Sequence, residues 1–133
     1  MSPKILLFLI GLAIVCIGVA PAAQSDCLKW HFSGQFTFIR SDGRKLTVGL
    51  LRHGQGITGE AYYYERRLYW GDAKGYIDGD DFYVTIDWQP SRREIYEGHI
   101  DAQGHLSGTT YDEVDRDHRA TWYTKERLRC AYD

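Results

Sequence analysis

An acidic run near the end of the chain is the densest group of metal-binding or acid–base side chains in this sequence. Its members are Asp112, Glu113, Asp115, Asp117 and His118. Several oxygen ligands are what Ca²⁺ requires, but the run lacks the glycine and the terminal glutamate of a calcium loop. Two arginines, Arg116 and Arg119, lie beside the acids and are able to pair with them. We therefore expect a solvated hairpin loop and neither a metal nor a cofactor.

The other histidines and the serines show no spacing typical of a metal site or an activated nucleophile. His99 and His105 flank a predicted hairpin, and a sequence alone does not bring their rings together. No glycine-rich segment opens a helix, as a phosphate-binding loop requires. We expect a protein that is not an enzyme. An enzyme would need acid and base groups facing a cavity.

Aromatic residues make up 14% of the chain and are the better candidates for binding. Tryptophan and tyrosine offer a large apolar face with a polar tip. Four of them are candidates to stack a planar or sugar-like ligand inside a barrel: Trp88, Trp122, Tyr63 and Tyr111. The same rings would also fill the core of a barrel that binds nothing inside, so both interpretations stay open.

Strands must position these side chains, and the sequence predicts eight of them. Apolar and polar residues alternate, and Asp-Gly or other glycine turns separate the segments. The predicted strands span residues 30–40, 45–52, 57–65, 71–77, 81–89, 93–101, 105–112 and 119–130. Residues 66–74 have the weakest strand pattern and are also compatible with a helical turn.

Short turns make consecutive strands pair, so the expected fold is all-β, a single eight-stranded antiparallel up-and-down barrel. Closure removes exposed edges. The interior of such a barrel is just wide enough to be packed solid or to hold one small ligand. In the fifth strand Phe82, Val84, Ile86 and Trp88 share the face that should point inward.

The first 22 residues have the pattern of a secretory signal peptide. Lys4 precedes an apolar stretch, and Ala20-Pro21-Ala22 fits a cleavage site. The apolar stretch, residues 5–20, is shorter than the ~20 residues that span a bilayer. We expect a secreted or periplasmic protein whose barrel domain covers residues 23–133. An uncleaved N-terminal anchor is the alternative.

Two cysteines, Cys27 and Cys130, remain near the two ends of the predicted mature chain. In an exported protein such a pair predicts a disulfide bond. Closing a loop of about 100 residues contributes about 4–5 kcal/mol of stability in the chain-entropy model.

Basic residues are dispersed along a chain with a formal net charge of −2, so we expect no nucleic-acid partner.

Three segments resemble avidin-like barrels of the calycin group, which also includes the lipocalins. They are residues 82–88 (FYVTIDW), 96–100 (YEGHI) and 120–123 (ATWY). The same part of the chain resembles uncharacterised secreted bacterial proteins with a Gly-x-Thr-x-Asp motif, which departs here to GTTYD at residues 108–112. The resemblance implies a calycin-like meander that binds a ligand in its lumen.

The chain departs from these families where their ligand and signature residues lie. Trp30 is followed by HFSGQ, without the Asn and Ser set that holds biotin in avidins, so biotin binding is not expected. The Gly-x-Trp opening of lipocalins is also absent, because Leu28-Lys29-Trp30 holds no glycine.

Two functions fit these observations. The first is a non-enzymatic barrel that binds a small apolar or aromatic molecule in its lumen through the four rings named above. The second is a packed barrel that binds a protein, for example as an inhibitor of an exported enzyme. Tyrosine and arginine are enriched in interfaces. The candidate residues for that surface are Tyr62, Tyr64, Arg66 and Arg67. No stable membrane insertion is expected after signal cleavage.

Overall fold

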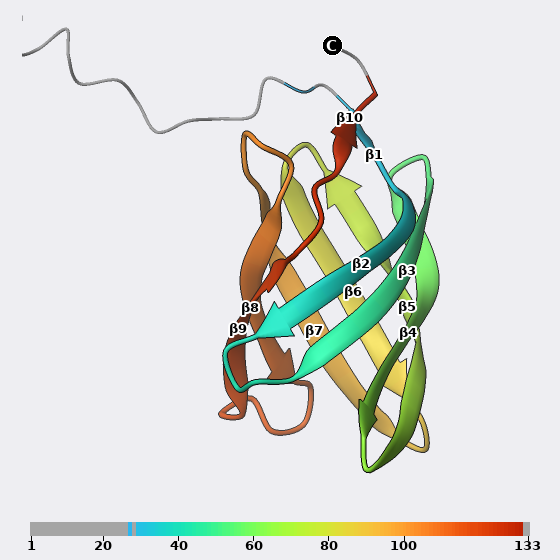
Figure 1. The fold of residues 1–133 in the computed structure, drawn as a ribbon, viewed down its shortest axis with the longest axis vertical. Helices are drawn as coiled ribbons and strands as arrows, with labels where there is room; N and C mark the ends of the chain where they lie inside the picture. The colour runs from blue at the N-terminus through green and yellow to red at the C-terminus, as the bar shows by residue number, and fades with distance from the viewer. Residues whose placement is uncertain (1–26, 28, 132–133) are drawn as a thin grey trace, which may run out of the picture.

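The alternating pattern produces ten β-strands in the computed structural model, which describes Cys27 and residues 29–131 (Figure 1). The predicted signal peptide, residues 1–22, lies outside the described residues. The strands are β1 (Trp30–His31), β2 (Ser33–Arg40), β3 (Lys45–His53), β4 (Gly56–Glu65), β5 (Arg67–Asp78), β6 (Asp81–Trp88), β7 (Arg92–Ile100), β8 (Leu106–Asp112), β9 (Arg119–Thr124) and β10 (Arg129–Cys130). In the described part of the chain, no helix is long and apolar enough to cross a membrane.

Strands β2 to β9 form a closed antiparallel barrel in which each strand pairs with the next along the chain. The barrel closes where β2 pairs with β9, with Phe38 opposite Thr124 and Arg40 opposite Trp122. The predicted all-β, eight-stranded up-and-down barrel is therefore confirmed, and it is consistent with a calycin-like fold.

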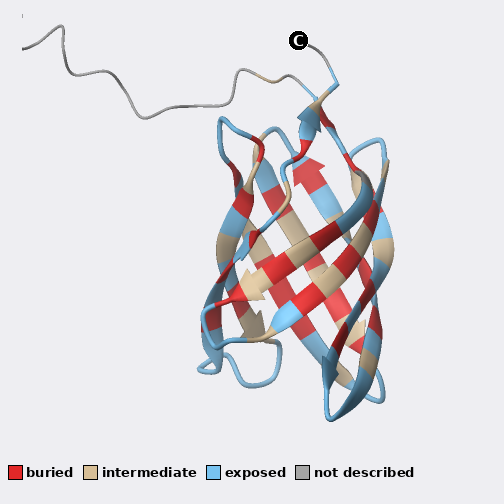
Figure 2. Cartoon of the chain, viewed as in Figure 1, coloured by how far each residue is buried: buried red, intermediate tan, exposed pale blue. Residues whose placement is uncertain are grey.

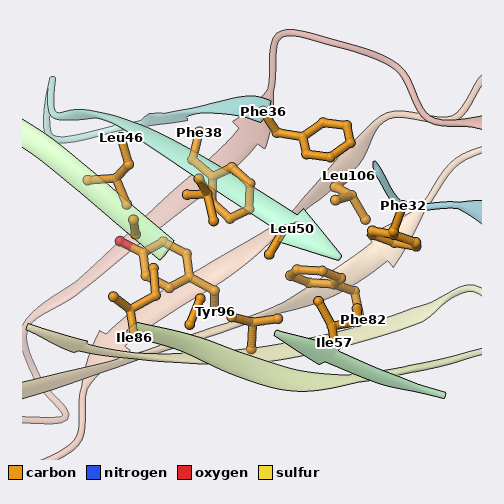
Figure 3. Packing of buried hydrophobic residues seen from close by; sticks show 14 of the residues in the cluster. Phe32, Phe36, Phe38, Leu46, Leu50, Ile57, Phe82, Ile86, Tyr96 and Leu106 are labelled. Carbon is orange, nitrogen blue, oxygen red and sulfur yellow. The ribbon is translucent and has the colours of Figure 1, made fainter. Parts of the chain in front are cut away.

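Buried and more exposed residues alternate along most strands of the barrel (Figure 2), although β7 has three buried residues in succession. In β6, Phe82, Val84, Ile86 and Trp88 are buried as predicted. Figure 3 shows rings and branched side chains of β2, β3, β6 and β7 meeting inside the barrel. Trp122 stacks on Phe38 with their ring centroids 4.6 Å apart. Side chains thus fill the region in which a lumen ligand would lie.

Residues 66–74 are not a helical turn. Strand β5 begins at Arg67, and its pairing with β4 continues to the last pair before the turn, in which Glu65 lies opposite Arg67. Arg66 makes the turn between the two strands with a φ of 66°, a conformation that usually requires glycine. The turn carries none of the glycine or proline signals that mark most of the other hairpins, which explains why the sequence pattern is weakest there.

The first and last predicted strands are each divided in two. β1 leaves the barrel and pairs with β10 in a separate two-stranded sheet, with Trp30 opposite Cys130. Trp30 and Leu128 are buried at this end of the barrel. The indole Nε1 of Trp30 donates to Asp80 Oδ1 at 3.2 Å.

The predicted disulfide between Cys27 and Cys130 is present and joins residues 103 positions apart. A pair of hydrogen bonds also holds the C-terminal segment to the barrel. The backbone N–H of Thr37 donates to Glu126 Oε1 at 2.6 Å, and its hydroxyl donates to Oε2 at 2.9 Å. Burial raises the pKa of Glu126, but these hydrogen bonds outweigh it and hold the pKa below its ordinary value of 4.5.

Replacing both Cys27 and Cys130 by Ser should lower the free energy of unfolding by about 4 kcal/mol, because the loop that the disulfide closes is long. Urea unfolding of the oxidised protein and of the double variant measures the difference. A loss below about 1 kcal/mol would show that the cross-link restrains the unfolded chain far less than the chain-entropy model requires.

The Glu126 carboxylate should stabilise the protein at neutral pH and lose this effect in acid. A lowered pKa means that the contribution is present above the unfolded pKa and disappears as the pH falls through the folded pKa. The stability difference between the wild type and Glu126→Gln should therefore shrink between about pH 5 and pH 3. Urea unfolding across this range measures it, with the exposed Glu60→Gln as control. A difference independent of pH would contradict the prediction.

Candidate functional site

One end of the barrel interior holds a buried ion pair. Arg40 points inward from the end of β2, and its Nη1 donates to Glu94 Oε2 of β7 at 2.7 Å. The two side chains are only 1% and 3% exposed. On its other side the Arg40 guanidinium donates to both carboxylate oxygens of Asp42, at 3.1 and 2.6 Å. The planar fork of arginine suits this double recognition.

Two aromatic side chains complete the surroundings of Glu94. The indole of Trp88 donates to its Oε1 at 2.5 Å, and the hydroxyl of Tyr96 lies 3.4 Å from the same atom. Burial and the nearby Glu94 carboxylate raise the pKa of Tyr96, so its phenol stays protonated. This network therefore gives the buried carboxylate hydrogen-bond donors in addition to its cation.

The four predicted lumen residues do not form one site. Trp88, Trp122 and Tyr63 are buried at 2%, 2% and 5% exposure. Tyr63 packs edge-on against Trp88, with centroids 4.9 Å apart, and accepts a hydrogen bond from Arg92. Tyr111 is half-buried on the outer wall, where the guanidinium of Arg119 lies 5.1 Å from its ring.

Five hollows of about 480 to 510 Å³ along the described residues lie on the rim or the outer wall and open to solvent. One of them is bordered by Trp88 and the turn that follows it. Another lies between the turn after β2 and the end of β4, and is bordered by Arg44, Lys45, Tyr64 and Glu65. All five hollows therefore lie outside the packed interior of the barrel.

The hairpin of β4 and β5 extends beyond both of its neighbours. Pairing of β4 with β3 reaches Tyr62, and pairing of β5 with β6 reaches Gly71. Residues 63–70 continue as a two-stranded projection, which we call the hairpin arm. It protrudes at the end of the barrel opposite β1 and β10 (Figure 1).

The outer face of this hairpin is apolar and exposed. Tyr62 lies opposite Trp70 and Tyr64 opposite Leu68, so the four side chains form two adjacent cross-strand pairs. Their exposed fractions are 41%, 52%, 75% and 58%. We call these four residues the aromatic face. Arg66 and Arg67 are exposed at the tip beside it.

The opposite side of the arm is held against the barrel. Tyr63 and Tyr69 stack with a centroid distance of 4.8 Å and an interplanar angle of 10°. The guanidinium of Arg44 lies 4.4 Å from the centre of the Tyr63 ring, and that of Arg67 lies 4.6 Å from Tyr69. Because Tyr63 also contacts Trp88, aromatic contacts connect the arm to the core.

All four residues predicted for a protein-binding surface, Tyr62, Tyr64, Arg66 and Arg67, lie on this hairpin. Sequence reasoning missed Leu68 and Trp70, because it did not extend β5 to Arg67. The signal was present: both share the parity of Asp72 and Lys74, which lie on the outer face of the same strand.

The acidic run at residues 112–118 forms an ordered loop. Asp112 Oδ1 accepts hydrogen bonds from the backbone of Val114 and Asp115 at 2.9 and 3.1 Å, and Glu113 pairs with Arg93. The two histidines considered above each contact an aspartate, His99 with Asp81 and His105 with Asp101. Among the described residues, no three His, Cys, Asp or Glu side chains come together as metal ligands.

Comparison of the chain with protein-family models, curated proteins and solved structures found no match.

Removing one member of the buried ion pair should be much more destabilising than removing both charges. Arg40→Met leaves the buried Glu94 carboxylate with only the more distant Arg92, whose Nη2 lies 3.9 Å from Oε1, and breaking a buried pair typically costs about 3–5 kcal/mol. Adding Glu94→Gln removes that charge and keeps an acceptor for Trp88, so about 1–3 kcal/mol should return. Urea unfolding of the wild type, both single variants and the double variant measures the coupling. Additive losses would contradict a direct interaction.

Proposed function

We propose that this protein is an exported, non-enzymatic barrel that binds a partner protein through the aromatic face of its β4–β5 hairpin. The observation that carries the proposal is the combination of exposed apolar side chains on the outer side with a fixed aromatic stack on the inner side. The disulfide supports an oxidising compartment, where such bonds form and persist.

The composition of the surface is that of an interface centre. Tyrosine, tryptophan and arginine are the residue types most often responsible for binding energy. Four of the eight large hydrophobic side chains exposed in the described part of the chain belong to the aromatic face. Grouped exposed apolar residues indicate an interaction site, whereas scattered ones do not.

The arm is also organised before binding. The stack of Tyr63 on Tyr69 and the cation–π contacts of Arg44 and Arg67 hold the strands from behind. A surface that is already in its bound conformation loses less conformational entropy when a partner binds. A projecting, rigid arm fits into a concave surface, which favours a cleft of an exported enzyme as the binding site on the partner.

Charge indicates the chemistry of the partner. Arg66 and Arg67 at the tip and Lys45 beside it are exposed, on a chain whose formal net charge is −2. A local basic patch on an acidic protein steers an acidic partner toward the patch. We therefore infer a partner whose cleft has an apolar centre and acidic groups at its rim.

A small ligand in the lumen has less support. Trp88, Trp122 and Tyr63 are engaged in core contacts with Glu94, Phe38 and Tyr69. A ligand there would have to displace these side chains, whereas the aromatic face is already exposed.

Replacing Tyr64 and Trp70 by Ser should abolish partner binding while the barrel stays folded. Central aromatic residues each contribute about 2 kcal/mol or more, so the affinity should fall at least about 100-fold. The immobilised protein is exposed to the secreted and periplasmic fractions of its own cells, and each retained protein is purified for calorimetric titration.

The matched control is Tyr123→Ser, because Tyr123 is as exposed as Trp70, at 52%, but lies on β9. Its affinity should stay within about threefold of the wild type, as expected outside an interface. Near-ultraviolet circular dichroism verifies the fold of each variant. Equal retention by the wild type and the arm variant, or retention of nothing by the wild type, would contradict the proposed function.

A further inference from the structure

The edge of β4 at Tyr64 lacks the neighbouring strand that the rest of β4 has. Pairing of β3 with β4 ends at Thr47 opposite Tyr62, although β3 itself begins at Lys45 and β4 runs to Glu65. The two strands therefore diverge before their ends, and the closed barrel has an open edge at this place.

The direction in which backbone N–H and C=O groups point shows which residue of β4 faces the open edge. In an antiparallel ladder, the N–H and C=O of successive residues point alternately to the two sides. The carbonyl of Trp70 accepts from the N–H of Gln89, so Trp70 points its backbone groups away from β4. Its partner Tyr62 consequently points toward β3. Two residues on, Tyr64 points its N–H and C=O to the same side, where no strand pairs with it.

Space for a chain exists beside this edge. A hollow of about 480 Å³ lies there, bordered by Asp42, Gly43, Arg44, Lys45, Tyr64 and Glu65. An added strand would lie about 4.8 Å from β4, the ordinary spacing in a sheet. The opposite edge of the arm, at Leu68, is also beyond its neighbouring strand, but none of the five hollows is bordered by Leu68.

We infer that the open edge of β4 accepts an extended, acidic segment of the partner protein as an additional strand. The inference rests on the proposed function and specifies how the partner is held. Tyr64 supplies one donor and one acceptor to the segment, and its side chain contacts the residue opposite. Lys45 borders the hollow on the β3 side and attracts carboxylates, as do the exposed Arg66 and Arg67 at the tip, whereas Arg44 is already paired with Glu65 at 3.3 Å.

The same basic residues disfavour pairing of this edge with the arm of a second copy of this chain. Edge-to-edge pairing of two arms would bring Lys45 and Arg66 of both copies to the same edge. Basic residues on an exposed edge are a common device against self-association. The two acids that border the hollow, Asp42 and Glu65, are paired with Arg40 and Arg44, so an acidic segment meets chiefly Lys45 there and charge favours it over a second copy.

The test uses a synthetic peptide of about eight residues, a usual strand length, that alternates Glu and Val. Amide hydrogen exchange is measured by NMR on the full barrel with its disulfide intact. At saturation, exchange at the Tyr64 amide should slow at least about tenfold, because the amide gains a hydrogen bond. The Leu68 amide is the internal control, since it faces the opposite edge, and its exchange should not change.

Two further probes separate charge from backbone pairing. A peptide with Lys in place of Glu should bind at least about tenfold more weakly, and Lys45→Glu should reduce this preference. A Glu-Val peptide with alternate N-methylated residues should not protect Tyr64, because it lacks the donors that pair with the edge.

Each outcome decides the inference. Protection of Tyr64 alone by the Glu-Val peptide supports strand addition. Binding that protects neither amide, or both equally, overturns it, as does failure of the peptide to bind. These results leave the proposed function intact, because the partner-binding test with the Tyr64 and Trp70 variants does not depend on the Tyr64 backbone. If the proposed function itself is wrong, the wild type and the variant with Tyr64 and Trp70 replaced will instead retain partner proteins equally.

Discussion

Closure of the barrel between β2 and β9 is the constraint on which the rest of this structure depends. A closed antiparallel barrel of eight strands pairs its edges and leaves an interior about as wide as the side chains that fill it. Phe38 and Trp122, which lie on the two closing strands, stack on each other inside the barrel. Side chains of the closed strands thereby fill the lumen. The surfaces that are left for the proposed partner protein are the outer wall and the strands that extend beyond their neighbours.

The buried Arg40–Glu94 pair connects closure to the arm. Glu94 holds the indole of Trp88, Trp88 contacts Tyr63, and Tyr63 stacks on Tyr69 of the arm. A buried ion pair is weak evidence for stability, but its geometry restricts the positions of its partners. The rigidity of the outer surface therefore begins with a polar interaction inside the barrel, and a change at Glu94 is able to alter the arm through these contacts.

Much of this fold follows from the sequence, because alternation and glycine turns act locally. The face of β6 that holds Phe82 and Trp88 was predicted, and so was the bond between Cys27 and Cys130. The start of β5 was not, because Arg66 adopts a positive φ without being glycine and leaves no turn signal. Tyr111 was placed among the lumen candidates, although the alternation that puts Thr110 inside puts its neighbour outside.

The aromatic face and the open edge have to act together. A net hydrogen bond contributes only about 0.5–1.5 kcal/mol, whereas association loses at least about 4 kcal/mol of translational and rotational freedom. The single residue of free edge at Tyr64 therefore holds a segment only together with side-chain contacts, such as that between the Tyr64 ring and the residue opposite it in the segment. Exposed rings provide affinity but little directional information, because apolar contacts have no preferred orientation. The rings on the outer face supply the affinity, and the edge fixes the direction in which the partner chain lies.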